Sequence, residues 1–168
     1  MKSIVFGLCL LGGAVFTALP ALQSDAAERS EGGKYFDDVG IATYHVAEDG
    51  TVDWFTYSGF RRYHSDCHVC HGPDGLGSSF APSLVDSLKT LSYDLFVEIV
   101  VNGRENVDTG DQNKMPAFGL NPNVTCYLDD LYVYLKARSD GAINRGRPSK
   151  KEAKSEETRE EEAACMGG

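Results

Sequence analysis

The sequence predicts a mostly α-helical fold with a small β-hairpin extension near the N-terminus. Apolar side chains recur at three- and four-residue steps in 92–103 and 122–135, the spacing of one face of an α-helix. A third helix is expected over 57–66, immediately before a Cys-x-x-Cys-His motif. The hairpin is expected from an Asp-Gly turn between two short β-prone runs. With 168 residues, the chain has room for one domain with appendages.

Residues 1–26 have the features of a cleaved export signal. Lys2 gives a short basic start, and an apolar run follows over 4–22. Small residues at the end of this run fit a signal-peptidase site, with cleavage after Ala26 or Ala27. An uncleaved membrane anchor is the alternative, which the proline and the small residues disfavour. We therefore expect a periplasmic protein without stable membrane insertion, because no later stretch is apolar enough to span a bilayer.

Residues 27–54 are expected to form an N-terminal extension that contains the hairpin. The β-prone runs 43–46 and 51–54 flank Ala47–Gly50, whose Asp-Gly pair favours a tight turn. The helix that follows places Gly59 on the same face as the first cysteine of the motif, which it precedes by eight residues.

The motif at 67–71 is the attachment signature of a c-type haem. The thiols of Cys67 and Cys70 add across the two vinyl groups of the porphyrin, and one helical turn presents both sulfur atoms to the same edge. The neighbouring His71 can then bind the iron. Haem is attached to such motifs outside the bacterial cytoplasm, which agrees with the export signal. The alternatives are a redox-active disulfide, a zinc knuckle and a chance match.

Two features after the motif complete the expected haem site. Residues 72–77 predict a flexible loop, because they are rich in glycine. Pro82 fixes an extended backbone whose carbonyl group is placed to accept the Nδ1–H of His71, which would orient the imidazole and increase its donor strength. An ordinary loop proline is the alternative. The preceding hairpin is expected to cover an edge of the haem, with His45 as a surface residue rather than an iron ligand.

Met115 is the expected second iron ligand. It is the only methionine between the initiator and Met166, and its thioether is a soft ligand for haem iron. An imidazole and a thioether together leave no open position on the iron, which predicts an electron carrier and not an enzyme. The rival class is a five-coordinate haem enzyme or a gas or redox sensor, which requires that Met115 does not bind the iron.

The haem domain is expected over 55–141, followed by a charged tail over 142–168. Few apolar residues occur in the tail, so we expect it to be disordered or loosely docked, with a surface helix as the alternative. Cys126 and Cys165 remain as a pair in an oxidising compartment, which favours a disulfide between the tail and the last helix. Their spacing does not show proximity, so two free thiols stay the alternative.

The charge of the chain restricts its partners. The formal net charge is −9, from 16 basic and 25 acidic residues. Such a surface repels nucleic acid and anionic lipid. It suits a protein partner with a positive docking patch, or serves solubility alone.

The order of these features resembles a class I cytochrome c. The match covers about 55–138: a helix with Gly59 and Tyr63, the motif, Pro82, Met115-Pro116, and a last helix with Tyr134-Leu135-Lys136. The resemblance implies helices around one covalent haem c. It also implies that the first and last helices cross at right angles, with Tyr134 packed on Gly59.

A narrower resemblance concerns the electron donor. The runs Phe80–Leu84, Asp86–Thr90, Met115–Gly119 and Tyr132–Arg138 are similar to those of methanol-metabolism-related c-type cytochromes. That group accepts electrons from pyrroloquinoline-quinone (PQQ) alcohol dehydrogenases, notably the lanthanide-dependent methanol dehydrogenase. The resemblance implies such an enzyme as the donor, and a small cytochrome c or a terminal oxidase as the acceptor.

Overall fold

The computed structural model describes residues 28–29, 32–105 and 114–167; the expected export signal lies outside them. The described part is mostly α-helical, as predicted. Its helices are α1 (Trp54–Asp66), α2 (His68–His71), the 3-10 turn η1 (Pro73–Gly75), α3 (Leu84–Ser87), α4 (Tyr93–Asn102), α5 (Pro122–Thr125), α6 (Leu128–Ser139) and α7 (Glu156–Met166). Its strands are β1 (Glu28–Arg29), β2 (Tyr35–Phe36), β3 (Ala42–Thr43), β4 (Arg104–Glu105) and β5 (Lys114–Met115).

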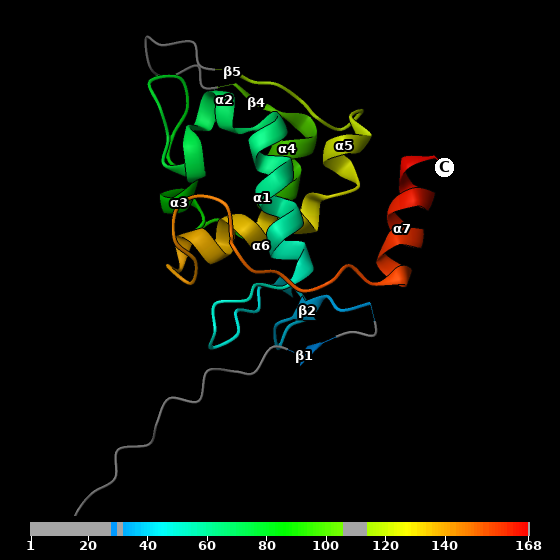
Figure 1. Cartoon of the computed structure of the whole chain (residues 1–168). Coiled ribbons are helices and arrows are strands. Elements are labelled where there is room, and N and C mark those ends of the chain that lie inside the picture. The colour runs from blue at the N-terminus through cyan, green and yellow to red at the C-terminus, as the bar shows by residue number, and fades with distance from the viewer. Residues whose placement is uncertain (1–27, 30–31, 106–113, 168) are drawn as a thin grey trace, which may run out of the picture.

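Helices α1 and α6 cross at the centre of the molecule (Figure 1). The crossing is closest at Gly59, where an added Cβ would lie 1.9 Å from the carbonyl oxygen of Asp130 and 2.6 Å from the Cβ of Tyr134. Only glycine permits this approach. The expected packing of Tyr134 on Gly59 is therefore confirmed.

Local capping signals fix the helix starts. Ser92 caps α4 and Asn121 caps α5, since each side chain accepts a backbone amide of the first turn. Helix α1 begins three residues earlier than expected because Asp53 accepts the Thr56 amide at 2.8 Å. The predicted last helix is interrupted after Thr125, and the chain resumes as α6 at Leu128.

The N-terminal extension contains more strand structure than predicted. Strands β1, β2 and β3 form an antiparallel sheet in that order. The predicted hairpin follows as a bridge between Val46 and Val52, closed by a 2.9 Å bond from the Ala47 amide to the Thr51 carbonyl. The three-stranded sheet packs on α6 at the end of the molecule opposite α2 (Figure 1), so the extension lies away from the motif.

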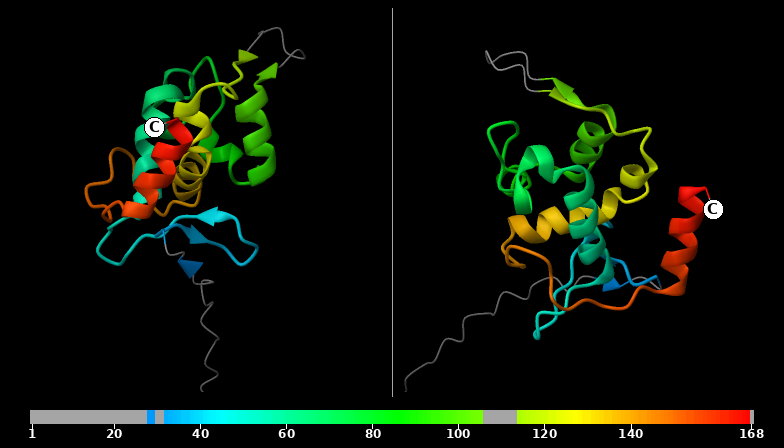
Figure 2. Two further views of the ribbon diagram at one scale, coloured as in Figure 1. Left: turned by 90° about the vertical axis from the view of Figure 1, so that its right-hand side faces the viewer. Right: turned by 45° about the horizontal axis from the view of Figure 1, so that its top comes forward.

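The C-terminal tail is docked along the domain and ends in α7 (Figure 2). Its strand-like part pairs with the extension through a parallel bridge between Val52 and Lys151. Helix α7 is tied to the segment before α6 by the disulfide Cys126–Cys165, so the predicted bond is confirmed. The surface helix is thus the alternative that the structure shows. None of the described helices is long and apolar enough to cross a membrane.

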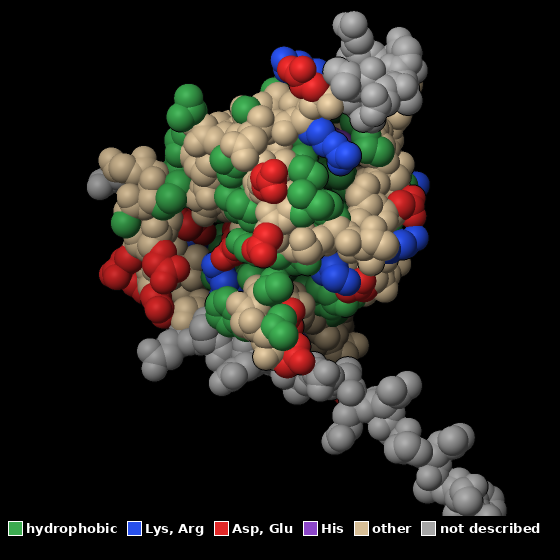
Figure 3. Space-filling model, turned by 180° about the vertical axis from the view of Figure 1, so that it is seen from behind, with side chains coloured by type: hydrophobic (Ala, Val, Ile, Leu, Met, Phe, Trp, Pro, Cys, Tyr) green, Lys and Arg blue, Asp and Glu red, His purple; other side chains and the backbone are tan. Residues whose placement is uncertain are grey.

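The charges of the tail are divided along its length. Its six basic residues lie between Arg145 and Arg159, and five of its six glutamates fall within 156–162. Figure 3 shows acidic side chains gathered at the edge of the molecule where α7 lies. Helix α7 therefore presents an acidic surface to solvent.

Candidate functional site

The Cys-x-x-Cys-His motif forms a tight turn at the end of α1. The Cys67 amide still donates to Tyr63 at 2.9 Å, and the Cys67 carbonyl accepts the amides of Cys70 and His71 at 3.3 and 3.1 Å. Neither cysteine of the motif takes part in a disulfide. The turn therefore carries two thiols and an imidazole within a single turn of backbone, as the sequence predicted.

The imidazole of His71 is fixed by a backbone group. Its Nδ1 lies 3.0 Å from the Pro82 carbonyl oxygen, and the side chain is buried. A carbonyl group only accepts, so Nδ1 carries the ring proton. The unprotonated Nε2 is then the nitrogen that can bind a metal, and the Nδ1–H bond increases its donor strength.

The loop after the motif is an ordered turn and not the flexible loop predicted. The Tyr63 hydroxyl donates to the Gly72 carbonyl and accepts the Gly75 amide at 3.0 Å. The Gly77 amide donates to the His71 carbonyl at 2.7 Å. These bonds join the loop to α1 and to the motif. Glycine composition alone could not reveal them.

Asp74 in this loop is a buried residue that sequence reasoning missed. Its carboxylate accepts the Gly146 amide at 2.9 Å and the Arg145 Nε at 3.2 Å. Burial opposes ionisation, but these contacts outweigh it and lower the pKa of Asp74. His64 is half-buried, and its Nε2 lies 3.9 Å from the same carboxylate. No local sequence signal could identify partners more than seventy residues away.

Met115 lies in a second loop at the same end of the molecule as α2. It pairs with Arg104 between β5 and β4, and it is half-buried against the core (Figure 1). The amides of Phe118 and Gly119 donate to the carbonyls of Val100 and Val101 at 3.0 Å each. These bonds pair carbonyl groups in the last turn of α4 that have no partner within the helix. The loop that carries Met115 is therefore anchored to α4.

These residues fit a c-type haem. The chain offers an imidazole with a free Nε2, a thioether, two thiols on one turn, and exposed apolar side chains around the motif. Near the motif, Val69 is 71% exposed and Phe80 is 70% exposed. Exposed apolar surface of this kind marks a site for an apolar group or partner.

The two other readings of the motif fit less well. Burial first, then Asp66 and Cys70, raise the pKa of the Cys67 thiol to about 12, whereas reactive dithiols have a lowered pKa. Across the described parts of the chain, no three His, Cys, Asp or Glu side chains converge as a metal site would require.

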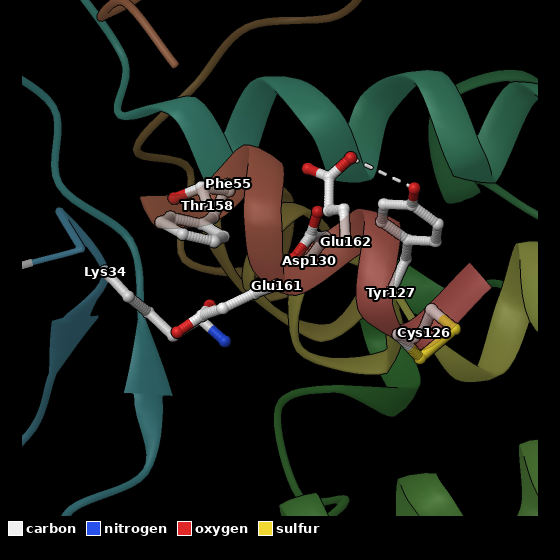
Figure 4. A pocket seen from close by; sticks show the side chains of 9 residues that line it. Lys34, Phe55, Cys126, Tyr127, Asp130, Thr158, Glu161 and Glu162 are labelled. Carbon is white, nitrogen blue, oxygen red and sulfur yellow. Dashed lines mark hydrogen bonds between the residues drawn. A yellow bond between two sulfur atoms is a disulfide. The ribbon is translucent and has the colours of Figure 1, made fainter. Parts of the chain in front are cut away.

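A separate cavity of about 180 Å³ lies under α7, away from the motif (Figure 4). Asp130 and Glu162 line it, and Glu162 accepts the Tyr127 hydroxyl at 3.0 Å. Burial and the nearby Glu162 and Asp129 raise the pKa of Asp130 to about 7, despite a bond from Ser58 and the charge of Lys34. This cavity contains none of the expected haem ligands.

The chain is similar to known bacterial proteins. Residues 56–135 match the family described as cytochrome c oxidase, cbb3-type, subunit III. Cytochrome c-553I of Paracoccus denitrificans is 49% identical over 150 residues, which are 89% of this chain and 66% of that protein. This chain thus spans slightly less than two thirds of the length of that relative. Cytochrome c-555 of Methylococcus capsulatus (strain Bath) is 46% identical over 96 residues, or 56% of this chain and 72% of that protein.

The fold is similar to a solved structure as well. The crystal structure of the c-type cytochrome XoxG from Methylobacterium extorquens AM1 is similar, with a TM-score of 0.78 and 54% sequence identity. The match covers 86% of this chain and 88% of that chain. Fold, motif and relatives agree, and the predicted resemblance is confirmed. This chain therefore belongs to the c-type cytochromes, electron carriers that hold haem c covalently.

Proposed function

We propose that this cytochrome is a periplasmic single-electron carrier whose haem is attached to Cys67 and Cys70 and ligated by His71 and Met115. The observation that carries the proposal is the bond between His71 Nδ1 and the Pro82 carbonyl, which leaves Nε2 free to bind iron. The bound haem supplies a one-electron redox centre. Export of the chain by residues 1–26 agrees with this role.

The chain's own residues restrict what the site can do. The bond from His71 to Pro82, and the bonds of Phe118 and Gly119 to α4 just after Met115, support these two residues as the proposed ligands. Two such ligands leave no position for a substrate, and we propose a carrier and not an enzyme. Val69 and Phe80 provide an exposed apolar rim for short-lived docking, as a shuttle requires.

The proposed donor is a PQQ-dependent methanol or alcohol dehydrogenase. The runs 80–84, 86–90 and 132–138 support it through their resemblance to methanol-metabolism-related cytochromes. The net charge of −9 suits a donor with a positive docking patch. The proposed acceptor is a small cytochrome c or a terminal oxidase.

Stopped-flow reduction of the oxidised holoprotein by candidate quinoprotein dehydrogenases tests the donor. We expect rapid reduction by a methanol or alcohol dehydrogenase, and a rate that falls as salt is added, because charge attraction assists the encounter. If no such enzyme reduces the protein faster than a quinoprotein of unrelated specificity, the donor proposal is wrong, while the carrier proposal stands.

Substitution of Met115 tests the ligand set. Met115→Ala should keep the haem attached, allow cyanide or carbon monoxide to bind, and lower the reduction potential, because a thioether favours the reduced iron. The matched control is Met166→Ala, which removes a methionine from the end of α7 and should change neither property. If the wild-type protein already binds carbon monoxide, the five-coordinate enzyme or sensor is the better description.

A further inference from the structure

The C-terminal segment is hydrogen-bonded to the loop that follows the haem motif. The carboxylate of Asp74 accepts the Gly146 amide at 2.9 Å and the Arg145 Nε at 3.2 Å. The backbone carbonyl of Asp74 accepts the Nε of Arg138, at the end of α6, at 3.4 Å. Arg138 also donates to the Ile143 carbonyl at 2.7 Å. Side chain and backbone of one loop residue are thus both held by the segment 138–146.

The backbone conformation and the burial of Asp74 are both energetically unfavourable for an aspartate. Its φ is +61°, in the left-handed region that glycine adopts with least strain. The residue is only 5% exposed, and burial of a charge is unfavourable without partners. A glycine would satisfy the backbone, so the feature that the aspartate adds is its pair of bonds to Arg145 and Gly146.

The same loop is hydrogen-bonded to His71. Within the loop, the Ser83 hydroxyl donates to the Gly75 carbonyl at 3.4 Å. The Gly77 amide donates to the His71 carbonyl at 2.7 Å, and the Pro82 carbonyl lies 3.0 Å from Nδ1 of the same histidine. A continuous set of bonds therefore connects the tail, through residues 72–83, to the imidazole.

We propose that Asp74, Arg145 and Gly146 form a clamp through which the C-terminal segment positions the Pro82 carbonyl on His71 and so helps to set the reduction potential. This inference rests on the proposed ligation of the iron by His71. A strong bond at Nδ1 makes the imidazole a better donor and favours the oxidised state. A loosened clamp weakens that bond, and the potential rises.

The variant Arg145→Ala distinguishes the effect of the clamp on the reduction potential from the effect of the arginine charge alone. Loss of a positive charge near the haem would, by itself, stabilise the oxidised protein and lower the potential. Loss of the clamp raises it. The two explanations thus predict opposite signs for one variant. The Arg145 side chain is 65% exposed, so solvent weakens the charge effect and the positioning effect should dominate.

Three further variants complete the set. Asp74→Ala removes both bonds, whereas Asp74→Asn keeps an oxygen that can accept the Gly146 amide. Lys150→Ala is the matched control, because it also removes a cation from the tail but one that pairs with Asp49 on the distant hairpin. Should Asp74→Ala not accumulate as holoprotein, Asp74→Asn and Arg145→Ala still decide the question.

The measurements are the reduction potential of each holoprotein and the solvent exchange of the His71 ring N–H in the reduced protein, followed by NMR. We expect Arg145→Ala and Asp74→Ala to raise the potential, shifting the ratio of reduced to oxidised protein about threefold to tenfold, where tenfold is about 59 mV for one electron. Exchange should quicken in both. Asp74→Asn should shift less than Asp74→Ala, and Lys150→Ala not at all.

An unchanged or lowered potential in Arg145→Ala, with unchanged ring N–H exchange, overturns the clamp. Equal shifts in Asp74→Asn and Asp74→Ala also overturn it, because charge alone would then explain them. A failure of the proposed function is seen separately, since wild-type protein without histidine–methionine ligation would show it before any variant is compared.

Discussion

At the scale of single residues, the groups around a buried carboxyl decide whether its pKa is raised or lowered. Asp74 and Asp130 are both almost fully buried. Burial disfavours the charge of Asp74, but the Gly146 amide and Arg145 outweigh it and its pKa is lowered. For Asp130, burial and the nearby acidic Glu162 both disfavour ionisation, and they raise its pKa to about 7. The first carboxyl is ionised at neutral pH, and the second holds a proton until pH approaches 7.

This difference predicts a pH dependence of stability that belongs to Asp130. Its folded pKa of about 7 lies above the unfolded value of 3.8, so its contribution is complete below about pH 4 and is lost as pH rises through 7. Asp130→Asn should remove this loss, worth up to about 4 kcal/mol for about three pKa units. Denaturant unfolding of the holoprotein at pH 4, 6 and 8 measures it.

Asp129 provides the control for that measurement. Burial opposes its ionisation, but Lys34 and the Tyr93 hydroxyl lower its pKa, so its stabilising contribution is lost as pH falls. Asp129→Asn should therefore change the pH profile in the opposite direction. Parallel profiles for wild type and Asp130→Asn would show that the buried carboxyl does not titrate in this range.

The expected haem residues could be predicted from the sequence where their partners are close in the chain. His71 and the Pro82 carbonyl are eleven residues apart, and their contact was expected. The role of Asp74 was not, because Arg145 is 71 residues further on. Sequence patterns report local geometry, whereas a buried carboxylate is explained only by the segment that folds back onto it.

At the scale of secondary-structure elements, the same distinction holds. Ser92 and Asn121 cap their helices within the first turn, so the starts of α4 and α5 were predictable. The break between α5 and α6 was not. There, Tyr127 lies under the Arg62 guanidinium, 3.4 Å from the ring centre, and donates to Glu162 of α7. Tertiary contacts thus override a continuous helical pattern.

The crossing of α1 and α6 predicts the effect of Gly59→Ala. The added methyl group would lie 1.9 Å from the Asp130 carbonyl, a backbone atom that cannot rotate away. We expect a loss of about 3 kcal/mol or more in unfolding free energy and a lower yield of holoprotein, because the helices must separate. Denaturant unfolding and absorbance of the attached haem measure these effects.

Tyr134→Phe is the control at the same crossing. It keeps the ring against Gly59 and removes a buried hydroxyl that has no partner among the described residues. Unfolding free energy should stay the same or rise slightly. A Gly59→Ala variant as stable as this control would mean that the two helices have room to move apart.

At the scale of the whole molecule, the tail shows why composition misled. Residues 142–168 hold few apolar side chains, which favours disorder in isolation. The folded domain supplies what the tail lacks: Arg145 meets Asp74, Lys150 meets Asp49, and Thr158 donates to the Gly32 carbonyl. Within the tail, Lys154 pairs with Glu162 at 2.6 Å and Arg159 with Glu156 at 2.7 Å, while acidic side chains still gather where α7 lies (Figure 3). Docking of the tail is thus a property of the assembled fold.

The disulfide carries the last prediction, made with the double variant Cys126→Ser/Cys165→Ser. Its two cysteines are 39 residues apart, and the loop-closure entropy for that length is worth about 4 kcal/mol. Helix α7 has 11 residues, too few to persist alone in water. We therefore expect the variant to lose stability and the amides of α7 to exchange freely, as measured by denaturant unfolding and hydrogen exchange. Reduction of the wild-type bond should reproduce both effects.

The reduction potential of the same variant shows which part of the tail affects the haem. The clamp on Asp74 is formed by Arg145 and Gly146, which precede α7 and also depend on Arg138 at the end of α6. Detachment of α7 should therefore leave the potential unchanged while stability falls. A potential that moves with the disulfide would show instead that α7 itself acts on the haem end, and the boundary between positioning segment and stabilising helix would have to be drawn beyond residue 146.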